Sequence, residues 1–303
     1  MNEYSFLPTI TDKHILLEKY SKLTAQLLLN RKIENLDDAE KFLSPQWSDN
    51  HDPFLLHDME KSIKRFYDAV KNNEKITIYA DYDADGIPGS IVLANLLEKI
   101  NYENFDIYIP HRHDEGYGIH IPALEKIKES GTALIITIDV GITAHDAADW
   151  SVKNAVDMII TDHHLPLKKS DETQNLPESF ALINPKQTLC EYPDPMLCGC
   201  GVIFKFVQAF VKNYGEEFNI HPEWEKWLLD MVGISTISDM VPLQNENRIF
   251  ASFGLKVIQE ISKPRNNHRI GLKKLLWDSG INAQYMTEED IAFGITPRIN
   301  AAS

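Results

Sequence analysis

Acidic and histidine side chains follow three separate apolar runs of this sequence. They are Asp81, Asp83 and Asp85 after the run 76–80, Asp139 after 133–138, and Asp162, His163 and His164 after 158–160. So many carboxylates cannot stay ionised side by side without a cation, because like charges a few ångströms apart repel strongly. Asp with neutral His suits Mn²⁺, Zn²⁺ or Fe²⁺, whereas ligation by oxygen alone favours Mg²⁺ or Ca²⁺. This number of ligands can hold two ions about 3.5–4 Å apart, the usual apparatus for hydrolysis of a phosphate ester.

Each cluster taken alone has a simpler interpretation. Asp81–Gly86 begins like a calcium-binding loop, but position twelve of such a loop would be Val92 instead of Glu, and a strand precedes it. Aspartates often cap a strand-to-helix turn, and an isolated Asp139 would be one more cap. Adjacent histidines also occur by chance. The prediction of a metal site therefore rests on all three clusters together.

The runs that precede the clusters are typical of strands buried on both faces. Five short β-rich runs alternate with segments of helical spacing at 91–100, 121–128 and 144–153; the runs are 76–80, 105–109, 133–138, 158–160 and 181–183. This alternation predicts a parallel sheet covered by helices on both sides. The carboxyl ends of parallel strands meet at one edge, where such folds bind ligands. We therefore expect the three clusters to converge there.

Helical segments are expected at both ends of the chain. Asn35 begins a helix with acids in its first turn, which Pro45 ends, and residues 54–70 have an amphipathic pattern. From about residue 199 onward the pattern is mostly helical. The prediction is an α/β protein with a five-stranded, mainly parallel sheet. A helical N-terminal extension over 1–75 precedes a catalytic domain over 76–303, which divides into a parallel core (76–198) and a helical part (199–303).

Composition narrows the function classes. The chain has 303 residues, 43% of them hydrophobic, which excludes disorder as its main state. Thirty basic and 45 acidic residues give a net charge of −15, which argues against general electrostatic binding of nucleic acid. No apolar run approaches the roughly 20 residues of a membrane span, and the first residues do not resemble a signal peptide. With only three cysteines, these features favour a cytoplasmic protein with reduced thiols and no membrane partner.

Stretches outside the three clusters carry a family resemblance. They are residues 39–45, 115–118, 183–186, 197–201, 238–243 and 296–302. With the triplet Asp162–His164, they make the sequence resemble the DHH phosphoesterase superfamily and, within it, the bacterial RecJ-like exonucleases that act on single strands. The order and number of these matches are much more specific than the triplet alone.

The resemblance implies a role for each candidate residue. The implied ligands of two Mn²⁺ or Mg²⁺ ions are Asp83, Asp85, Asp139, His163 and Asp239, with Asp139 bridging both ions. His164 is implied to stabilise charge on the phosphate, and Asp162 to orient the histidine pair. Asp81 is either a supporting carboxylate or a turn residue. The implied DNA-facing residues are Arg112, Tyr117, Arg298 and Asn300. Core packing is the alternative for Tyr117, and a structural cap or ion pair for Arg298.

The implied activity is a metal-dependent 5′–3′ exonuclease that hydrolyses single-stranded DNA to 5′-mononucleotides, with His164, Asp139 and Asp162 as its catalytic residues. Two alternatives stay open: a phosphodiesterase for short oligonucleotides, cyclic dinucleotides or pyrophosphate, and a weakly active or non-catalytic scaffold. The family normally continues into a long helix, a glycine-rich lid domain and often an OB-fold, so we expect either a fragment or a natural truncation. By resemblance only, a helicase or a single-strand-binding protein is an expected partner of a monomer.

Basic residues gather at one place in the C-terminal part. They are Lys263, Arg265, His268, Arg269, Lys273 and Lys274. A contact with DNA phosphates and a solvated helix face are both open interpretations of this basic cluster.

Overall fold

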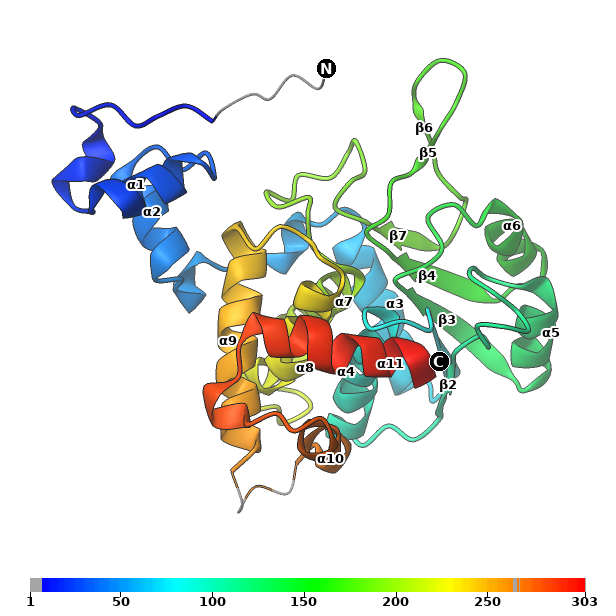
Figure 1. Ribbon diagram of the computed structural model, residues 1–303. Helices are drawn as coiled ribbons and strands as arrows, with labels where there is room; N and C mark the ends of the chain where they lie inside the picture. The colour runs from blue at the N-terminus through cyan, green and yellow to red at the C-terminus, as the bar shows by residue number, and fades with distance from the viewer. Residues whose placement is uncertain (1–6, 264–265, 267, 303) are drawn as a thin grey trace. The chain divides into compact units, whose positions relative to one another are not determined.

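The computed structural model describes residues 7–263, 266 and 268–302 (Figure 1). The chain divides into two compact units, one that ends at Asn50 and one that begins at His51. The smaller unit contains a 3-10 turn (Ile15–Glu18), α1 (Lys22–Leu29), α2 (Leu36–Leu43) and a second 3-10 turn (Trp47–Asp49). Its small core consists of Ile10, Leu16, Ala25, Leu28, Ile33 and Ala39. As predicted, Asn35 caps α2, by accepting the backbone N–H of Asp38.

A five-stranded parallel sheet is the centre of the larger unit, which confirms the predicted fold class. Its strand order is β2-β1-β3-β4-β7, and every neighbouring pair is parallel. The strands are β1 (Lys75–Ala80), β2 (Phe105–Tyr108), β3 (Thr132–Ile138), β4 (Asp157–Thr161) and β7 (Ala181–Ile183). A separate antiparallel pair, β5 (Leu167–Lys168) and β6 (Gln174–Asn175), was not predicted, because two-residue strands leave no periodicity in the sequence.

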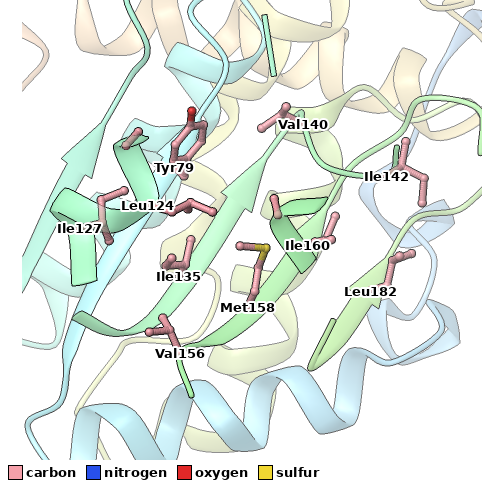
Figure 2. Close-up of a cluster of buried hydrophobic side chains, with 12 residues drawn as sticks. Tyr79, Leu124, Ile127, Ile135, Val140, Ile142, Val156, Met158, Ile160 and Leu182 are labelled. Carbon is pink, nitrogen blue, oxygen red and sulfur yellow. The ribbon is translucent and has the colours of Figure 1, made fainter. Parts of the chain in front are cut away.

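Helices cover both faces of the sheet (Figure 1). One face contacts α3 (Met59–Lys71), α4 (Gly86–Lys99) and α7 (Gly199–Tyr214), and the other contacts α5 (Ile121–Glu129) and α6 (His145–Lys153). Figure 2 shows the core on the α5/α6 side, where Ile135, Met158 and Ile160 project from neighbouring strands. Leu134, Ile136 and Ile159, which alternate with them along the same strands, are also fully buried, so the central strands are apolar on both faces.

Two helix starts differ from the predicted ones. α4 begins at Gly86, five residues before the predicted start, because the side chain of Asp83 accepts the N–H groups of its first turn and Pro88 suits that turn. α3 begins at Met59, and the preceding Pro53–Leu55 forms a separate 3-10 turn that Asp52 caps. Because α3 contacts the sheet, it lies in the same unit as the sheet; the predicted domain boundary after residue 75 stays a prediction.

The C-terminal part is helical, as predicted. Its elements are a 3-10 turn (Trp224–Leu228), α8 (Leu229–Ser238), α9 (Asn245–Ile261), α10 (Ile270–Asp278), a 3-10 turn (Ala283–Tyr285), a π-helix (Asp290–Ile295) and α11 (Thr296–Ala302). α8 packs against α9 and against α4 and α7, so it connects this part to the sheet layer. None of the helices in the described part of the chain is long and apolar enough to span a membrane.

A buried ion pair links α7 to α9. Lys205 and Glu246 form this pair with no exposed side-chain surface. Lys205 also donates to the carbonyl oxygen of His51 over 2.9 Å, and the hydroxyl of Tyr192 donates to Glu246. The pair therefore connects two helices with the chain segments before α3 and before α7.

Candidate metal centre

The register of the sheet places four polar residues side by side at its carboxyl edge. Ala80, Ile138, Thr161 and Ile183 are aligned across β1, β3, β4 and β7. The next residues of these strands are therefore neighbours: Asp81, Asp139, Asp162 and Asn184. Backbone bonds continue the pairing by one step, from the Asp81 N–H to Ile138 O (3.2 Å), from Asp139 to Thr161 O (3.0 Å) and from Asp162 to Ile183 O (3.1 Å). The expected convergence of the three clusters is confirmed.

The loop after β1 is a tight turn held by its own side chains. Oδ1 of Asp83 accepts the N–H groups of Asp85 (2.8 Å) and Gly86 (3.0 Å). A Cβ atom on Gly86 would lie 2.3 Å from the carbonyl oxygen of Asp81, so no other residue fits there. Asp83 therefore caps the start of α4 through one carboxylate oxygen, which agrees with the simpler interpretation of this cluster as a strand-to-helix turn.

Asp139 has a backbone conformation that is uncommon for a residue with a side chain. Its φ angle is +62°, in the left-handed region, directly after β3. The residue is 2% exposed, and its Oδ1 has no hydrogen-bond partner among the described residues. A strained backbone and an unpaired buried oxygen at one residue are typical of a functional site.

Two elements outside the sheet complete the centre. The start of α7 donates two backbone N–H groups to Asp85, from Gly199 (2.6 Å) and Cys200 (2.8 Å). Asp239 is the C-cap of α8. Nε2 of His163 lies between these elements and the sheet, 3.2 Å from Asp139 Oδ1, 3.5 Å from Asp239 Oδ2 and 3.7 Å from Asp85 Oδ2.

Three groups of side chains could each hold a divalent cation. Within each group the ligand atoms lie within 4.8 Å of one another; the groups are Asp81–Asp83–Asp139, Asp85–His163–Asp239 and Asp139–His163–His164. Among the described residues, both ring nitrogens of His163, Oδ1 of Asp81 and Oδ1 of Asp139 are buried without a hydrogen-bond partner. Buried polar atoms that lack partners and point to a shared centre fit metal ligation. Asp139 belongs to two groups, as a bridging ligand would.

Without a cation, this carboxylate cluster favours protonation. Burial, with the charges of Asp85 and Asp83, raises the pKa of Asp139 well above its usual value. Burial together with Asp85 raises the pKa of Asp239 to about 7, and burial raises that of Asp81 to about 6. A divalent cation would offset the repulsion that drives these shifts.

His164 is oriented by Asp162. Its Nδ1 lies 2.8 Å from Asp162 Oδ1, and the same oxygen accepts the backbone N–H groups of His163 and His164. The hydrogen bond to Asp162 raises the pKa of His164 above its ordinary value. Burial would raise the pKa of Asp162, but its bonds from His164 and from the N–H of Ile142 outweigh burial and lower it. Both shifts favour a positively charged His164 beside a negatively charged Asp162.

The four residues predicted to face DNA have different surroundings. Tyr117 is 51% exposed, and its ring centroid is 6.0 Å from that of His164. The guanidinium of Arg112 lies over the ring of Tyr82, 4.1 Å from its centroid. Asn300 of α11 accepts the backbone N–H of Ala84 over 2.8 Å, so it contacts the loop after β1. Arg298 is exposed and donates to the carbonyl oxygen of Gly294 over 2.5 Å. A DNA contact stays a prediction for all four.

The sequence interpretation did not single out three residues of this centre. Asn184 donates from its amide to the carbonyl oxygen of His164 over 2.9 Å. The sequence pattern could have indicated Asn184, because it directly follows the apolar run 181–183, as the aspartates of the centre follow the other apolar runs. Lys186 is half-buried and interacts electrostatically with Asp239, Asp162 and Asp139. Ser235 of α8 donates to Asp85, a contact that no local pattern reveals.

The basic cluster of the C-terminal part is largely paired with acids. Lys263 pairs with Glu260, Arg269 with the buried Asp230, and Lys274 with Asp278. Arg265 lies outside the described residues. These ion pairs favour the interpretation as a structural and solvated face.

The parallel α/β sheet thus has a carboxylate and histidine centre at its carboxyl edge, an arrangement that suits hydrolysis of phosphate esters. The chain belongs to the DHH family: the model of the DHH family, N-terminal domain, matches residues 75–236.

Curated relatives connect this domain to one kind of nuclease. The chain is 39% identical to the single-stranded-DNA-specific exonuclease RecJ of Bacillus subtilis, over 92% of this chain and 33% of that protein. It is 31% identical to the RecJ of Haemophilus influenzae, over 92% of this chain and 47% of the relative. A crystal structure of exonuclease RecJ bound to manganese is similar at 29% identity with a TM-score of 0.68, covering 82% of this chain and 57% of that one. The chain thus spans between a third and about half of the length of these curated relatives.

Proposed function

We propose that this chain is the catalytic core of a RecJ-like exonuclease, which hydrolyses single-stranded DNA in the 5′–3′ direction to 5′-mononucleotides. The observation that carries the proposal is the set of three overlapping ligand groups at one sheet edge, in which Asp139 and His163 each belong to two groups and His164 is held by Asp162. The similarity to RecJ proteins over most of this chain supports DNA as the substrate.

The residues present fit two divalent cations, Mn²⁺ or Mg²⁺. Asp83, Asp85, Asp139, His163 and Asp239 would hold the ions. Asp139 would lie between them, because it belongs to the group with Asp83 and its Oδ1 is 3.2 Å from Nε2 of His163 in the other group. Asp81 would support the pair from the same group as Asp83. When bound, such ions supply the charge that activates water and stabilises the phosphoryl transition state.

His164 would act on the phosphate. Its Nδ1 donates to Asp162, which leaves Nε2 available to donate to a phosphate oxygen. Because the bond to Asp162 raises the pKa of His164, its imidazolium persists to higher pH than that of an unpaired histidine, and it would stabilise the negative charge that develops on the phosphate. Asp162 is thus a positioning residue that holds the tautomer and the ring plane.

The substrate would pass the rim that Tyr117 and Arg112 form next to this centre. Tyr117 is exposed beside His164, where its ring could stack on a base for about 1–3 kcal/mol. Arg112 would contact a phosphate, since its planar donors match two oxygens at once. Asn300 holds the loop after β1, and Arg298 on the same helix is a candidate for a further phosphate contact.

The test is hydrolysis of a single-stranded oligonucleotide labelled at its 5′ end, with Mn²⁺, with Mg²⁺ and with EDTA. We expect the first labelled product to be a mononucleotide, formed only with metal, and its loss in His164→Ala. Absence of any product with either metal would refute activity of this chain. A length series separates the alternatives: cleavage confined to oligonucleotides of two to four residues would indicate a short-substrate phosphodiesterase. Absence of stoichiometric metal by elemental analysis would indicate a scaffold.

A further inference from the structure

Among the proposed metal ligands, Asp85 has both of its carboxylate oxygens held by donors from two other helices. Its Oδ2 accepts the N–H of Gly199 over 2.6 Å, and its Oδ1 accepts the N–H of Cys200 over 2.8 Å and the hydroxyl of Ser235. By contrast, one oxygen of Asp139 and one of Asp81 are buried without any such donor among the described residues. Asp85 is therefore fixed by the protein itself.

Two helices deliver these donors. Gly199 and Cys200 are the first residues of the 16-residue helix α7, whose N–H groups have no acceptor within the helix and favour a negative charge. Ser235 lies one turn before Asp239 on α8, and the N–H of Asp239 donates to the carbonyl oxygen of Ser235 over 2.9 Å. One turn of α8 thus carries both a donor to Asp85 and a second acid of the same ligand group.

We propose that Ser235 is a positioning residue for one of the two ion positions, an inference that rests on the proposed metal centre but not on DNA cleavage. Ser235 and the start of α7 hold Asp85 so that the group Asp85–His163–Asp239 has its ligand geometry before an ion arrives. In the group Asp81–Asp83–Asp139, by contrast, one buried oxygen of Asp81 and one of Asp139 have no hydrogen-bond partner among the described residues. The two ion positions therefore differ, and only the first depends on Ser235.

The packing of α7 against the centre explains why its first residue is Gly199. A Cβ atom at this position would lie 2.5 Å from Cβ and 2.6 Å from Oδ1 of Asp139. The same N-terminus that holds Asp85 is thus in close contact with Asp139. A methyl group here would displace the carboxylate that both ion positions are proposed to share.

The experiment is Mn²⁺ titration of the metal-free chain by calorimetry, with electron paramagnetic resonance to count bound ions. Wild type is expected to bind two ions. In Ser235→Ala we expect one binding step to weaken by about 10-fold or more, since partners of metal ligands typically contribute 10–100-fold. The other step should keep its wild-type affinity. The matched control is Ser151→Ala, which removes an equally buried serine hydroxyl that donates to Ala148 O on α6.

Three further measurements make the test decisive. In Ser235→Thr, which keeps the hydroxyl, we expect the weakened step to recover, and Gly199→Ala should weaken both steps. If Ser235→Ala were too unstable to titrate, Ser235→Thr against Ser235→Val would give the same comparison. If Ser235→Ala bound both Mn²⁺ ions with wild-type affinity, the inference would be overturned. Equal weakening of both binding steps in this variant would also overturn it. A wild type that binds no Mn²⁺ would overturn it together with the metal centre, whereas one that binds Mn²⁺ but cleaves no DNA would refute only the proposed exonuclease.

Discussion

Replacing Asp139 by Asn should have opposite effects on stability with and without metal. Asn has the shape of Asp and tolerates the left-handed backbone conformation of position 139, so the change removes a charge and little else. Without metal the variant loses a source of repulsion inside a buried cluster. With metal it loses the carboxylate that two ligand groups share.

The geometry gives the size of both effects. Ligand atoms within one group lie within 4.8 Å, and two unit charges at that distance repel by about 3.5 kcal/mol at an effective dielectric constant of about 20. Protonation relieves part of this repulsion, since the pKa of Asp239 already lies at about 7. We therefore expect Asp139→Asn to be about 1–3 kcal/mol more stable than wild type in EDTA at pH 8. In Mn²⁺ at a hundredfold excess over its Kd, wild type should gain about 2.7 kcal/mol for each bound ion, and the variant should gain little.

The measurement is urea unfolding of both proteins in EDTA and in Mn²⁺, at pH 8. The control is Asp149→Asn, which removes the same charge from an exposed position on α6 and should change neither result. If Asp139→Asn were less stable than wild type in EDTA by more than 1 kcal/mol, the argument from charge crowding would be wrong. An undiminished gain from Mn²⁺ would refute the bridging role.

Three other predictions concern the ion pair, the histidine and the metal. Glu246→Ala should lower the free energy of unfolding by about 3–5 kcal/mol in urea, because it removes the negative charge that balances the buried ammonium group of Lys205; a loss below 1 kcal/mol would contradict this. Asp162→Asn should move the alkaline limb of the pH–rate profile to lower pH, since the bond to Asp162 is what keeps His164 protonated to higher pH; an unmoved limb would exclude this role. Chelation by EDTA should weaken binding of a fluorescent single-stranded oligonucleotide, measured by anisotropy, because the uncompensated carboxylates repel phosphate; equal affinity in EDTA and Mn²⁺ would show that binding occurs elsewhere.

The fold was predictable because its strands are apolar on both faces. Such runs as 133–138 are uncommon outside parallel sheets, and their length and spacing located all five strands to within two residues at each end. Helix starts were less predictable, because they depend on single side-chain contacts. The start of α4 at Gly86 follows from a bond to Asp83 that only the folded turn reveals.

The candidate site was predictable as far as it lies on the sheet. Because the carboxyl ends of parallel strands lie at one edge, Asp81, Asp139 and Asp162 were predicted to be neighbours. The same reasoning predicts Asn184 as a fourth neighbour when amides are included with the acids. Ser235 could not be found in this way, since it reaches Asp85 only through the packing of α8 on α4 and α7. Periodicity locates the elements, but contacts between distant elements depend on tertiary packing.

The net charge of −15 has a local explanation that changes its meaning for substrate binding. Six of the 45 acidic residues lie at the metal centre, namely Asp81, Asp83, Asp85, Asp139, Asp162 and Asp239. Two divalent cations there would change the formal charge from −15 to −15 + 4 = −11 and would turn this acidic cluster into a centre that attracts phosphate. Elsewhere, bases such as Arg269 and Lys274 are paired with acids and add little net positive charge. Attraction for a DNA strand should therefore be concentrated at the loaded metal centre and its rim, with weak affinity for the rest of the surface.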